Sequence, residues 1–337
     1  MKRTFYLFSS GRLERKDNTL KFTPIRDGED GEEELTPRFL PIEDIAEIYA
    51  FGSLRTNSAL FNYLGQKGIP LHYYDYYENY TGSFMPRDGL LAGRVLLAQA
   101  KTYENKKRRT ELAKKFIQGA TWNMVVNLNY YNRRGKTMAD QINGIRQLAK
   151  TLDEAKSVEE VMGIEGNIRK IYYDCFDIII DDFCMGDRTK QPPQNEVNAL
   201  ISFGNMMCYT ETLRAIHQTQ LNPTISFLHT PGERRYSLSL DISEIFKPIL
   251  VDRVIFKTLN KHILSPKCFD KRLNSCLMNE KGKKLFVKAM EERYEETFRH
   301  RSLGRSVSYR HLIKLECYKL LKDIMGLEEY KPFKMYW

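Results

Sequence analysis

The chain has 337 residues, and its 53 Lys and Arg side chains outnumber its 43 Asp and Glu side chains, which gives a formal net charge of +10. A chain this long can bury a substantial core, so two domains are expected, and no apolar run approaches the roughly 20 residues of a membrane-spanning helix. The charge favours an anionic partner, either nucleic acid or a membrane surface, although a solvated basic surface that binds neither is equally compatible with it.

The N-terminus does not have the pattern of a secretory signal. The basic start Met1–Arg3 is followed by a short apolar stretch, Phe5–Phe8, and the chain turns polar at Ser9. We therefore expect a cytoplasmic protein. The six cysteines have no Cys-x-x-Cys spacing and are expected to be reduced, mostly buried thiols and not zinc ligands.

The first 86 residues have the pattern of a β-rich domain, because short runs of β-branched and aromatic residues alternate with turn residues. Strands are expected at Phe5–Phe8, Leu20–Phe22, Ile45–Phe51 and Ile69–Tyr74. The acidic, glycine-containing segment Arg26–Glu34 is expected to be a loop or a hairpin tip, and Asn57–Gly65 a short helix.

The apolar spacing changes from two to about three and a half residues after Pro86, which places a domain boundary between Pro86 and Arg87. Beyond it, helices are expected at Leu90–Glu104, Glu111–Tyr131, Met138–Ala149, Val158–Phe183, Glu196–Gln218 and Asp241–Asn260, with several more up to Gly326. The predicted fold class is α+β, with a small β-rich N-terminal domain at residues 1–86 and a larger all-α catalytic domain at residues 87–337.

Two carboxylates follow a histidine, His229, in the middle of the second domain. If Asp241 opens a helix, then Asp241 and Glu244 lie on one face, one turn apart, as a site for a hard cation requires. An Asp near a helix start followed three residues later by Glu is also the pattern of N-terminal capping. The spacing leaves both interpretations open.

Glu165 lies between two glycines, Gly163 and Gly166, inside a segment that otherwise has a helical pattern. Glycines in a helix interior cost about 1 kcal/mol each relative to alanine, and close approach of the backbone to another helix or to a ligand is the usual compensation. Tight helix packing beside a solvated Glu and a binding site are both compatible with this pattern.

Several segments taken together resemble one known family. They are Gly-x-Glu-Gly-x-x-x-x-x-Tyr around Glu165, the run Asn195–Asn205, His229 after Phe-Leu, Ser-Leu-x-Leu-Asp-x-x-Glu-x-Phe-Lys-Pro-x-x-x-Asp-Arg from Ser237, and, nearer the N-terminus, Phe51–Gly52 and Tyr80–Arg87. These segments are similar to the CRISPR-associated protein one family, the metal-dependent nuclease and integrase of CRISPR adaptation. The resemblance covers nearly the whole chain.

The resemblance implies one divalent ion per subunit, Mg²⁺ or Mn²⁺, bound by Glu165, His229 and Glu244. Two carboxylates and an imidazole suit these ions and lack the thiolates of structural zinc. Asp241 would support the site. Lys247 stands where many members carry Arg and is the candidate for holding a phosphate near the ion, although a solvated helix lysine is the commoner case. Glu244 stands where some members carry Asp.

The reaction that the resemblance implies is transesterification. The 3′-hydroxyl of a short double-stranded DNA fragment attacks a phosphodiester of the CRISPR repeat, and a DNA 3′-oxygen leaves. Two alternatives stay open. The protein could be a hydrolytic nuclease on DNA or branched DNA, in which water replaces the hydroxyl, or a non-catalytic DNA-binding scaffold, whose binding would survive chelation. The metal ligands would be the same in the integrase and in the hydrolytic nuclease, so they do not distinguish these two enzymes.

The resemblance also implies partners. These are a second copy of the chain, in a homodimer, and a dimer of CRISPR-associated protein two, with dimerisation and partner contacts assigned to the N-terminal domain.

Basic clusters supply candidate contacts to DNA phosphates. The residues are Lys106, Lys107, Arg108, Arg109, Arg133, Arg134, Arg301 and Arg305. Such contacts would be largely independent of sequence and strongly dependent on salt, through counterion release. Each cluster is equally compatible with a solvated helix face. Membrane binding is not expected, because the clusters are not joined to an apolar stripe.

Overall fold

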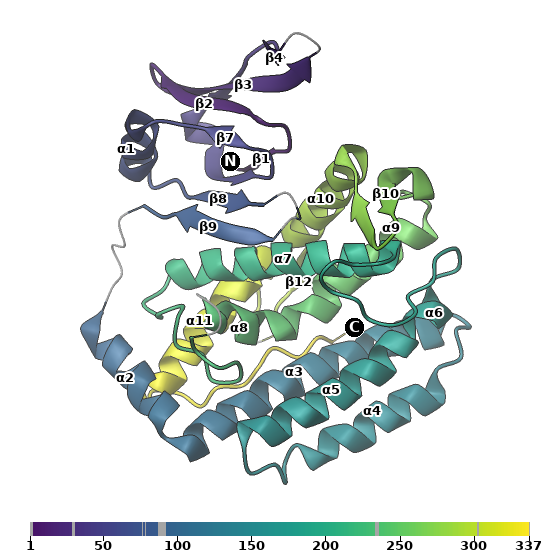
Figure 1. The fold of residues 1–337 in the computed structure, drawn as a ribbon. Coiled ribbons are helices and arrows are strands. Elements are labelled where there is room, and N and C mark those ends of the chain that lie inside the picture. Colours follow the sequence, from purple (N-terminus) through teal and green to yellow (C-terminus); the bar gives the residue numbers. More distant parts are fainter. Residues whose placement is uncertain are drawn as a thin grey trace. The chain divides into compact units, whose positions relative to one another are not determined.

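The computed structural model describes residues 3–28, 31–75, 77, 79–86, 92–232, 236–301 and 303–336. The chain divides into two compact units, residues 1–89 and 90–337 (Figure 1). The predicted boundary between Pro86 and Arg87 is next to residues 87–91, which lie outside the described residues. The α+β class is confirmed, because strands dominate the first unit and helices the second.

The first unit contains two sheets. One has the strand order β1-β6-β8-β9, in which β1, β6 and β8 are parallel and β9 is antiparallel to β8. The other has the order β4-β3-β2-β7, and β5 also pairs with β3. The strands are β1 (Arg3–Leu7), β2 (Gly11–Lys16), β3 (Thr19–Gly28), β4 (Gly31–Glu34), β5 (Arg38–Pro41), β6 (Ile45–Ala50), β7 (Leu54–Arg55), β8 (Leu71–Tyr74) and β9 (Tyr80–Phe84). Leu13, Leu20, Ile45, Ile48 and Leu60 are fully buried in the core of this unit.

The short helix and the hairpin expected in this unit are both present. α1 (Ser58–Lys67) begins after Asn57, whose side chain accepts a hydrogen bond from the Leu60 amide at 3.0 Å, and ends at Gly68, where φ is 68°. β3 and β4 form a hairpin within the segment Arg26–Glu34, although residues 29 and 30 are not among those described. The expected strands coincide with β1, β3, β6 and β8. The short or highly charged strands β2, β5, β7 and β9 are absent from the prediction.

Helices form most of the second unit (Figure 1). They are α2 (Gly93–Glu104), α3 (Lys106–Asn132), α4 (Ala139–Thr151), α5 (Val158–Asp174), α6 (Phe176–Ile179), α7 (Glu196–His217), α8 (Ser237–Lys247), α9 (Arg253–Asn260), α10 (Glu280–Glu295) and α11 (Tyr309–Ile324), with hairpins β10 (Phe269–Arg272) to β11 (Ser275–Met278) and β12 (Thr297–Arg299) to β13 (Ser306–Ser308). α7 is largely buried and packs against α8 and α11, while α3 packs against α5 and α8. None of the described helices is long and apolar enough to cross a membrane.

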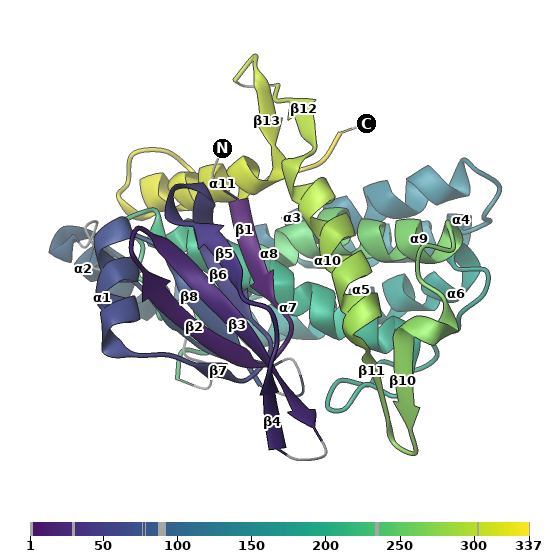
Figure 2. The ribbon, with the colours of Figure 1, turned by 90° about the horizontal axis from the view of Figure 1, so that it is seen from above.

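Two of the predicted helices are divided in the structure. The segment Val158–Phe183 contains α5 and the short α6, and the backbone is extended at Ile180. In the segment Asp241–Asn260, the helix begins earlier, at Ser237. Pro248 then opens a π-helical turn, because proline lacks the amide that a regular helix needs. The two hairpins, which extend beyond the helices in Figure 2, add strands to a unit that the sequence pattern predicts to be all-α.

Candidate active site

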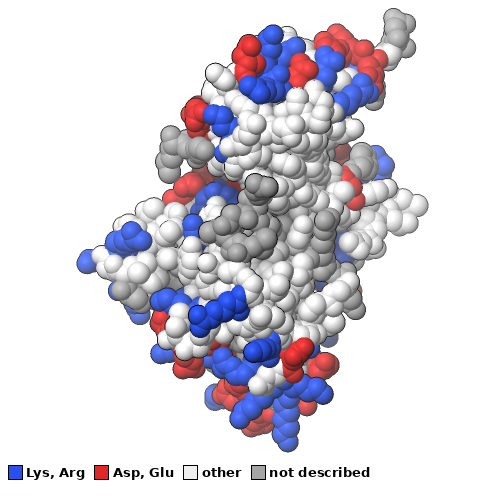
Figure 3. All heavy atoms as spheres, turned by 90° about the vertical axis from the view of Figure 1, so that its left-hand side faces the viewer, with Lys and Arg blue, Asp and Glu red and all other residues white. Residues whose placement is uncertain are grey.

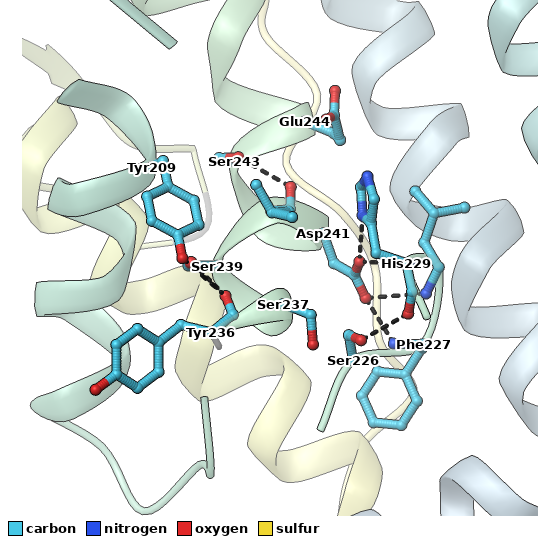
Figure 4. A network of polar contacts seen from close by, with 12 residues as sticks. Tyr209, Ser226, Phe227, His229, Tyr236, Ser237, Ser239, Asp241, Ser243 and Glu244 are labelled. Carbon is cyan, nitrogen blue, oxygen red and sulfur yellow. Dashed lines mark hydrogen bonds and ion pairs between the residues drawn. The ribbon is translucent and has the colours of Figure 1, made fainter. Parts of the chain in front are cut away.

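Asp241 of α8 holds the turn that carries His229 through hydrogen bonds from its backbone amides. Its carboxylate is fully buried, and Oδ2 accepts hydrogen bonds from the amides of Phe227 at 2.6 Å and Leu228 at 2.9 Å (Figure 4). Oδ1 accepts from the amide of His229 at 3.0 Å. Because α8 begins at Ser237, Asp241 lies in its second turn, and the capping interpretation is wrong. The carboxylate instead satisfies backbone donors of a neighbouring loop.

The same carboxylate orients the His229 ring. Nδ1 lies 2.8 Å from Oδ1 of Asp241, which makes Nδ1 the protonated nitrogen and leaves Nε2 with a lone pair. Figure 4 shows Nε2 pointing away from Asp241, on the side where Glu244 lies. Burial disfavours the imidazolium, but the hydrogen bond to Asp241 and the charges of Asp241 and Glu244 outweigh it, so the pKa of His229 is raised.

A guanidinium joins the two carboxylates on the other side of the site. Arg169 of α5 donates through Nε to Oε1 of Glu165, one turn away on the same helix, and through Nη2 to Oε2 of Glu244 on α8. Lys247 donates to the second Glu244 oxygen, Oε1, at 2.6 Å. Burial alone would raise the pKa of Glu244, but Arg169, Lys247 and His229 hold it at about 2, so this carboxylate is ionised.

Two of the three residues expected to bind a metal ion, Glu165 and Glu244, are therefore brought together by one side chain, Arg169. Both carboxylates bind the Arg169 guanidinium, and side chains of these types, two carboxylates and one imidazole, are ligands that suit Mg²⁺ or Mn²⁺. Among the described residues, no three His, Cys, Asp or Glu side chains are grouped closely enough to hold an ion together. The Arg169 guanidinium lies between the Glu165 and Glu244 carboxylates. Metal binding by these residues stays a prediction.

The glycines beside Glu165 do not serve helix packing. A Cβ atom placed on Gly163 or on Gly166 would meet nothing within 4 Å, and both residues are exposed. This finding removes the tight-packing interpretation. The helix face next to Glu165 is open, which is the arrangement that close approach of a ligand requires.

Lys247 is not a solvated helix lysine. Its side chain is 12% exposed and is held by Glu244. Its role as a phosphate contact stays a prediction, and it would require Lys247 to share its three donors between the carboxylate and a phosphate.

Arg109 supports the His229 turn, a role that the sequence does not reveal. Its Nε donates to the carbonyl oxygen of Phe227 at 2.9 Å, and its guanidinium lies 4.4 Å from the centre of the Tyr103 ring. On the other side of the turn, the hydroxyl of Ser226 donates to the carbonyl oxygen of His229 at 2.6 Å. Arg109 is therefore occupied within the protein, although its position in a basic cluster predicts a DNA contact.

The other basic candidates divide into two groups. Arg108 donates to Asp323 at 2.6 Å, while Arg134 and Arg301 lie over the rings of Tyr130 and Tyr336 at 3.6 Å and 3.9 Å. All of these residues are exposed, but within the described part of the chain the second group forms neither a salt bridge nor a ring contact: it consists of Lys106, Lys107, Arg133 and Arg305. Figure 3 shows Lys and Arg side chains among Asp and Glu at the lower end, where α2 and the start of α3 lie in Figure 1. DNA contacts by all eight residues stay predictions.

A third buried carboxylate, Asp252, lies at the end of the π-helical turn. Oδ2 of Asp252 accepts from the hydroxyl of Tyr172 at 2.9 Å, and Asn127 donates to that hydroxyl at 3.0 Å and to the carbonyl oxygen of Pro248 at 2.9 Å. Burial raises the pKa of Asp252 to about 7, against the hydrogen bond from Tyr172 and the charges of Arg169 and Lys247. This network joins α3, α5 and the turn behind the site.

Fold and site together define an α+β protein whose helical unit holds a histidine–aspartate pair beside a carboxylate cluster. The sequence matches the family described as CRISPR associated protein Cas1 over residues 5–292. It is 45% identical to the CRISPR-associated endonuclease Cas1 of Fusobacterium nucleatum, over all of this chain and 98% of that protein. The chain therefore belongs to the Cas1 family.

Solved structures agree with this assignment. A CAS1 protein from Thermotoga maritima superposes with a TM-score of 0.83 at 37% identity, covering 97% of this chain and 99% of the other. A casposase bound to integration product has a TM-score of 0.86 and covers 100% of this chain and 95% of its own, but at 20% identity it shows a shared fold alone.

Proposed function

We propose that this chain is the metal-dependent DNA endonuclease and integrase of CRISPR adaptation, which joins the 3′-hydroxyl ends of short double-stranded DNA fragments into the CRISPR repeat by transesterification. The observation that carries the proposal is the convergence of Glu165 and Glu244 on one cation, beside an imidazole fixed by Asp241. The name of the Fusobacterium nucleatum relative, an endonuclease, supports the same chemistry.

Glu165, His229 and Glu244 would hold one Mg²⁺ or Mn²⁺ in each subunit. When bound, such an ion neutralises phosphate oxygens and orients the attacking and leaving oxygens. Asp241 keeps the proton on Nδ1 of His229, so that Nε2 presents its lone pair to the site. Before an ion binds, Arg169 and Lys247 keep Glu244 ionised.

The reaction exchanges one phosphodiester bond for another. The 3′-oxygen of the fragment forms a bond to phosphorus, the bond to the 3′-oxygen of the repeat breaks, and the proton of the attacking hydroxyl passes to the leaving oxygen or to solvent. No protein nucleophile is required. The open face of α5 beside Glu165 is the approach that we assign to DNA.

The partners that we propose are double-stranded DNA, a second copy of the chain and a dimer of CRISPR-associated protein two. Of the predicted DNA contacts, we expect Lys106, Lys107, Arg133 and Arg305 to be the best placed, because they are exposed and, within the described residues, form neither a salt bridge nor a contact with an aromatic ring.

The test is strand joining of a fluorescent short duplex into a supercoiled plasmid that carries a repeat, with the partner protein and Mn²⁺ or Mg²⁺. We compare the wild type with His229→Ala and, as a control, His262→Ala, whose side chain is 75% exposed. Joining that needs both the ion and His229 supports the proposal. Plasmid cleavage without joining favours the hydrolytic nuclease, and DNA binding that survives chelation without any cleavage favours the scaffold. Joining unaffected by loss of His229 would mean that the site is elsewhere.

A further inference from the structure

Arg169 uses its donors on the groups expected to bind the ion. Nε donates to Glu165, Nη2 donates to Glu244, and Nη1 lies 3.4 Å from the hydroxyl of Tyr173. The side chain is 16% exposed, so water contributes little to its solvation. A divalent ion that bound the same Glu165 and Glu244 oxygens would need the place that the guanidinium fills.

The charges of the cluster balance before any ion enters. The carboxylates of Glu165 and Glu244 carry two negative charges, and Arg169 and Lys247 carry two positive charges in direct contact with them. A divalent ion therefore cannot simply be added. It would place two further positive charges beside two existing ones, at distances where such repulsion is large.

The folded protein needs a cation at this position. Glu244 is 8% exposed, and a buried carboxylate without a counterion is costly. Arg169 supplies that counterion from one turn along α5, and its planar fork can donate to both carboxylates at once, which an ammonium group does less well.

We infer that Arg169 is an internal competitor of the divalent ion: it holds Glu165 and Glu244 together until the ion binds, and it must release both carboxylates for the ion to enter. This inference rests on the proposed metal site. Arg169 acts as a positioning residue. Because it is a counterion for both carboxylates, the site can fold without a metal ion, but the affinity for the ion is lower.

The test measures Mn²⁺ affinity from the EPR signal of free Mn²⁺, in the full-length chain after chelator treatment. Arg169→Met is expected to bind Mn²⁺ about tenfold more tightly than the wild type, which is a coupling of ordinary size between two ligands of one site. By the same linkage, saturating Mn²⁺ raises the melting temperature of Arg169→Met more than that of the wild type. Arg169→Lys, which keeps the charge and is the safer variant to fold, is expected to lie between them.

Arg310→Met is the matched control. Arg310 is 14% exposed and binds three carboxylates, those of Glu211, Glu291 and Glu295. Its loss should lower stability and leave Mn²⁺ affinity unchanged. If Arg310→Met also binds Mn²⁺ more tightly, the gain in affinity follows from the lower net charge of the protein and not from competition by Arg169. That result would overturn the inference.

The remaining outcomes separate the inference from the proposed function. If the wild type binds Mn²⁺, His229→Ala binds it weakly, and both Arg169 variants bind as the wild type or more weakly, then the metal site stands and competition by Arg169 is wrong. If neither the wild type nor the Arg169 variants bind Mn²⁺, the proposed metal site fails, and the inference fails with it.

Discussion

Two carboxylates on one helix, Asp241 and Glu244, are three residues apart and are satisfied in opposite ways. Asp241 accepts hydrogen bonds from three backbone amides of one turn, whereas Glu244 is bound by two side-chain cations, Arg169 and Lys247. Backbone donors are fixed by the fold, but side-chain cations can rotate away. The difference separates a carboxylate that positions the site from one that can exchange its partner for a metal ion.

Asp241→Asn is expected to lower the free energy of unfolding and the rate of strand joining together, which makes its effect the largest. In either orientation of the new amide, its NH₂ group faces backbone N–H donors of the turn 227–229, so buried donors lose their acceptors. The free energy of unfolding should fall by about 2–4 kcal/mol, since each unsatisfied buried group costs about 1–3 kcal/mol. Strand joining should slow by about 10–100-fold, as for loss of the partner that orients a ligand histidine. Urea denaturation and the joining assay measure the two effects.

Glu244→Gln is the matched variant on the same helix. It should abolish Mn²⁺ binding and lower the free energy of unfolding less than Asp241→Asn does, because Arg169 keeps Glu165 as a partner. Equal losses of stability in the two variants would contradict the distinction between a positioning and an exchangeable carboxylate.

A third carboxylate, Asp252, differs from both because the donor that it binds is a neutral hydroxyl, that of Tyr172. Its pKa in the folded protein is about 7, above the ordinary 3.8, so folding favours the neutral form. The stability that this preference supplies is complete below the ordinary pKa and is lost as the pH rises through about 7.

Asp252→Asn should remove this pH dependence, because the amide does not titrate. The difference in unfolding free energy between the wild type and Asp252→Asn is expected to fall by roughly 1 kcal/mol per pH unit between about pH 5 and pH 7. Denaturation curves at a series of pH values measure it. A difference that does not change with pH would mean that Asp252 is ionised in the fold throughout this range.

The smallest effect is expected on the open side of Glu165. Gly166→Ala should raise the free energy of unfolding by about 1 kcal/mol, since a helical glycine is replaced and its Cβ meets nothing within 4 Å. It should nevertheless slow strand joining, because the new methyl group enters the face assigned to DNA. Gly144→Ala on α4, where the Cβ makes an ordinary 3.7 Å contact with Ile171, is the control. An unchanged rate of strand joining in Gly166→Ala would mean that DNA does not approach this face of α5.

The helices and strands that were predicted correctly are those that a local pattern of residues marks. The helices of the second unit are marked by apolar periodicity and by capping residues such as Ser157 and Asn195, which act on amides three residues away. The expected strands in the first unit are likewise apolar runs bounded by turns. The β10–β11 hairpin escaped prediction because its first strand is mostly charged and exposed.

The site depends on longer-range contacts that no local pattern contains. Spacing alone suggested that Asp241 and Glu244 act together, but the acceptor role of Asp241 is defined by a turn more than ten residues upstream. Arg169 reaches Glu244 across 75 positions of the chain, and Arg109 reaches Phe227 across 118. Glu165 and Arg169 are one helical turn apart, a spacing that a helix brings together, yet Arg169 was not among the predicted site residues.

The proposed metal site is tested most directly by the position of Mn²⁺ in crystals of the protein soaked with that ion, located by its anomalous scattering. We expect one peak in the helical unit, at roughly 2 Å from oxygens of Glu165 and Glu244 and from Nε2 of His229, with the Arg169 guanidinium turned away from both carboxylates. A peak at another group of side chains, or bound Mn²⁺ with Arg169 still bridging Glu165 and Glu244, would contradict it.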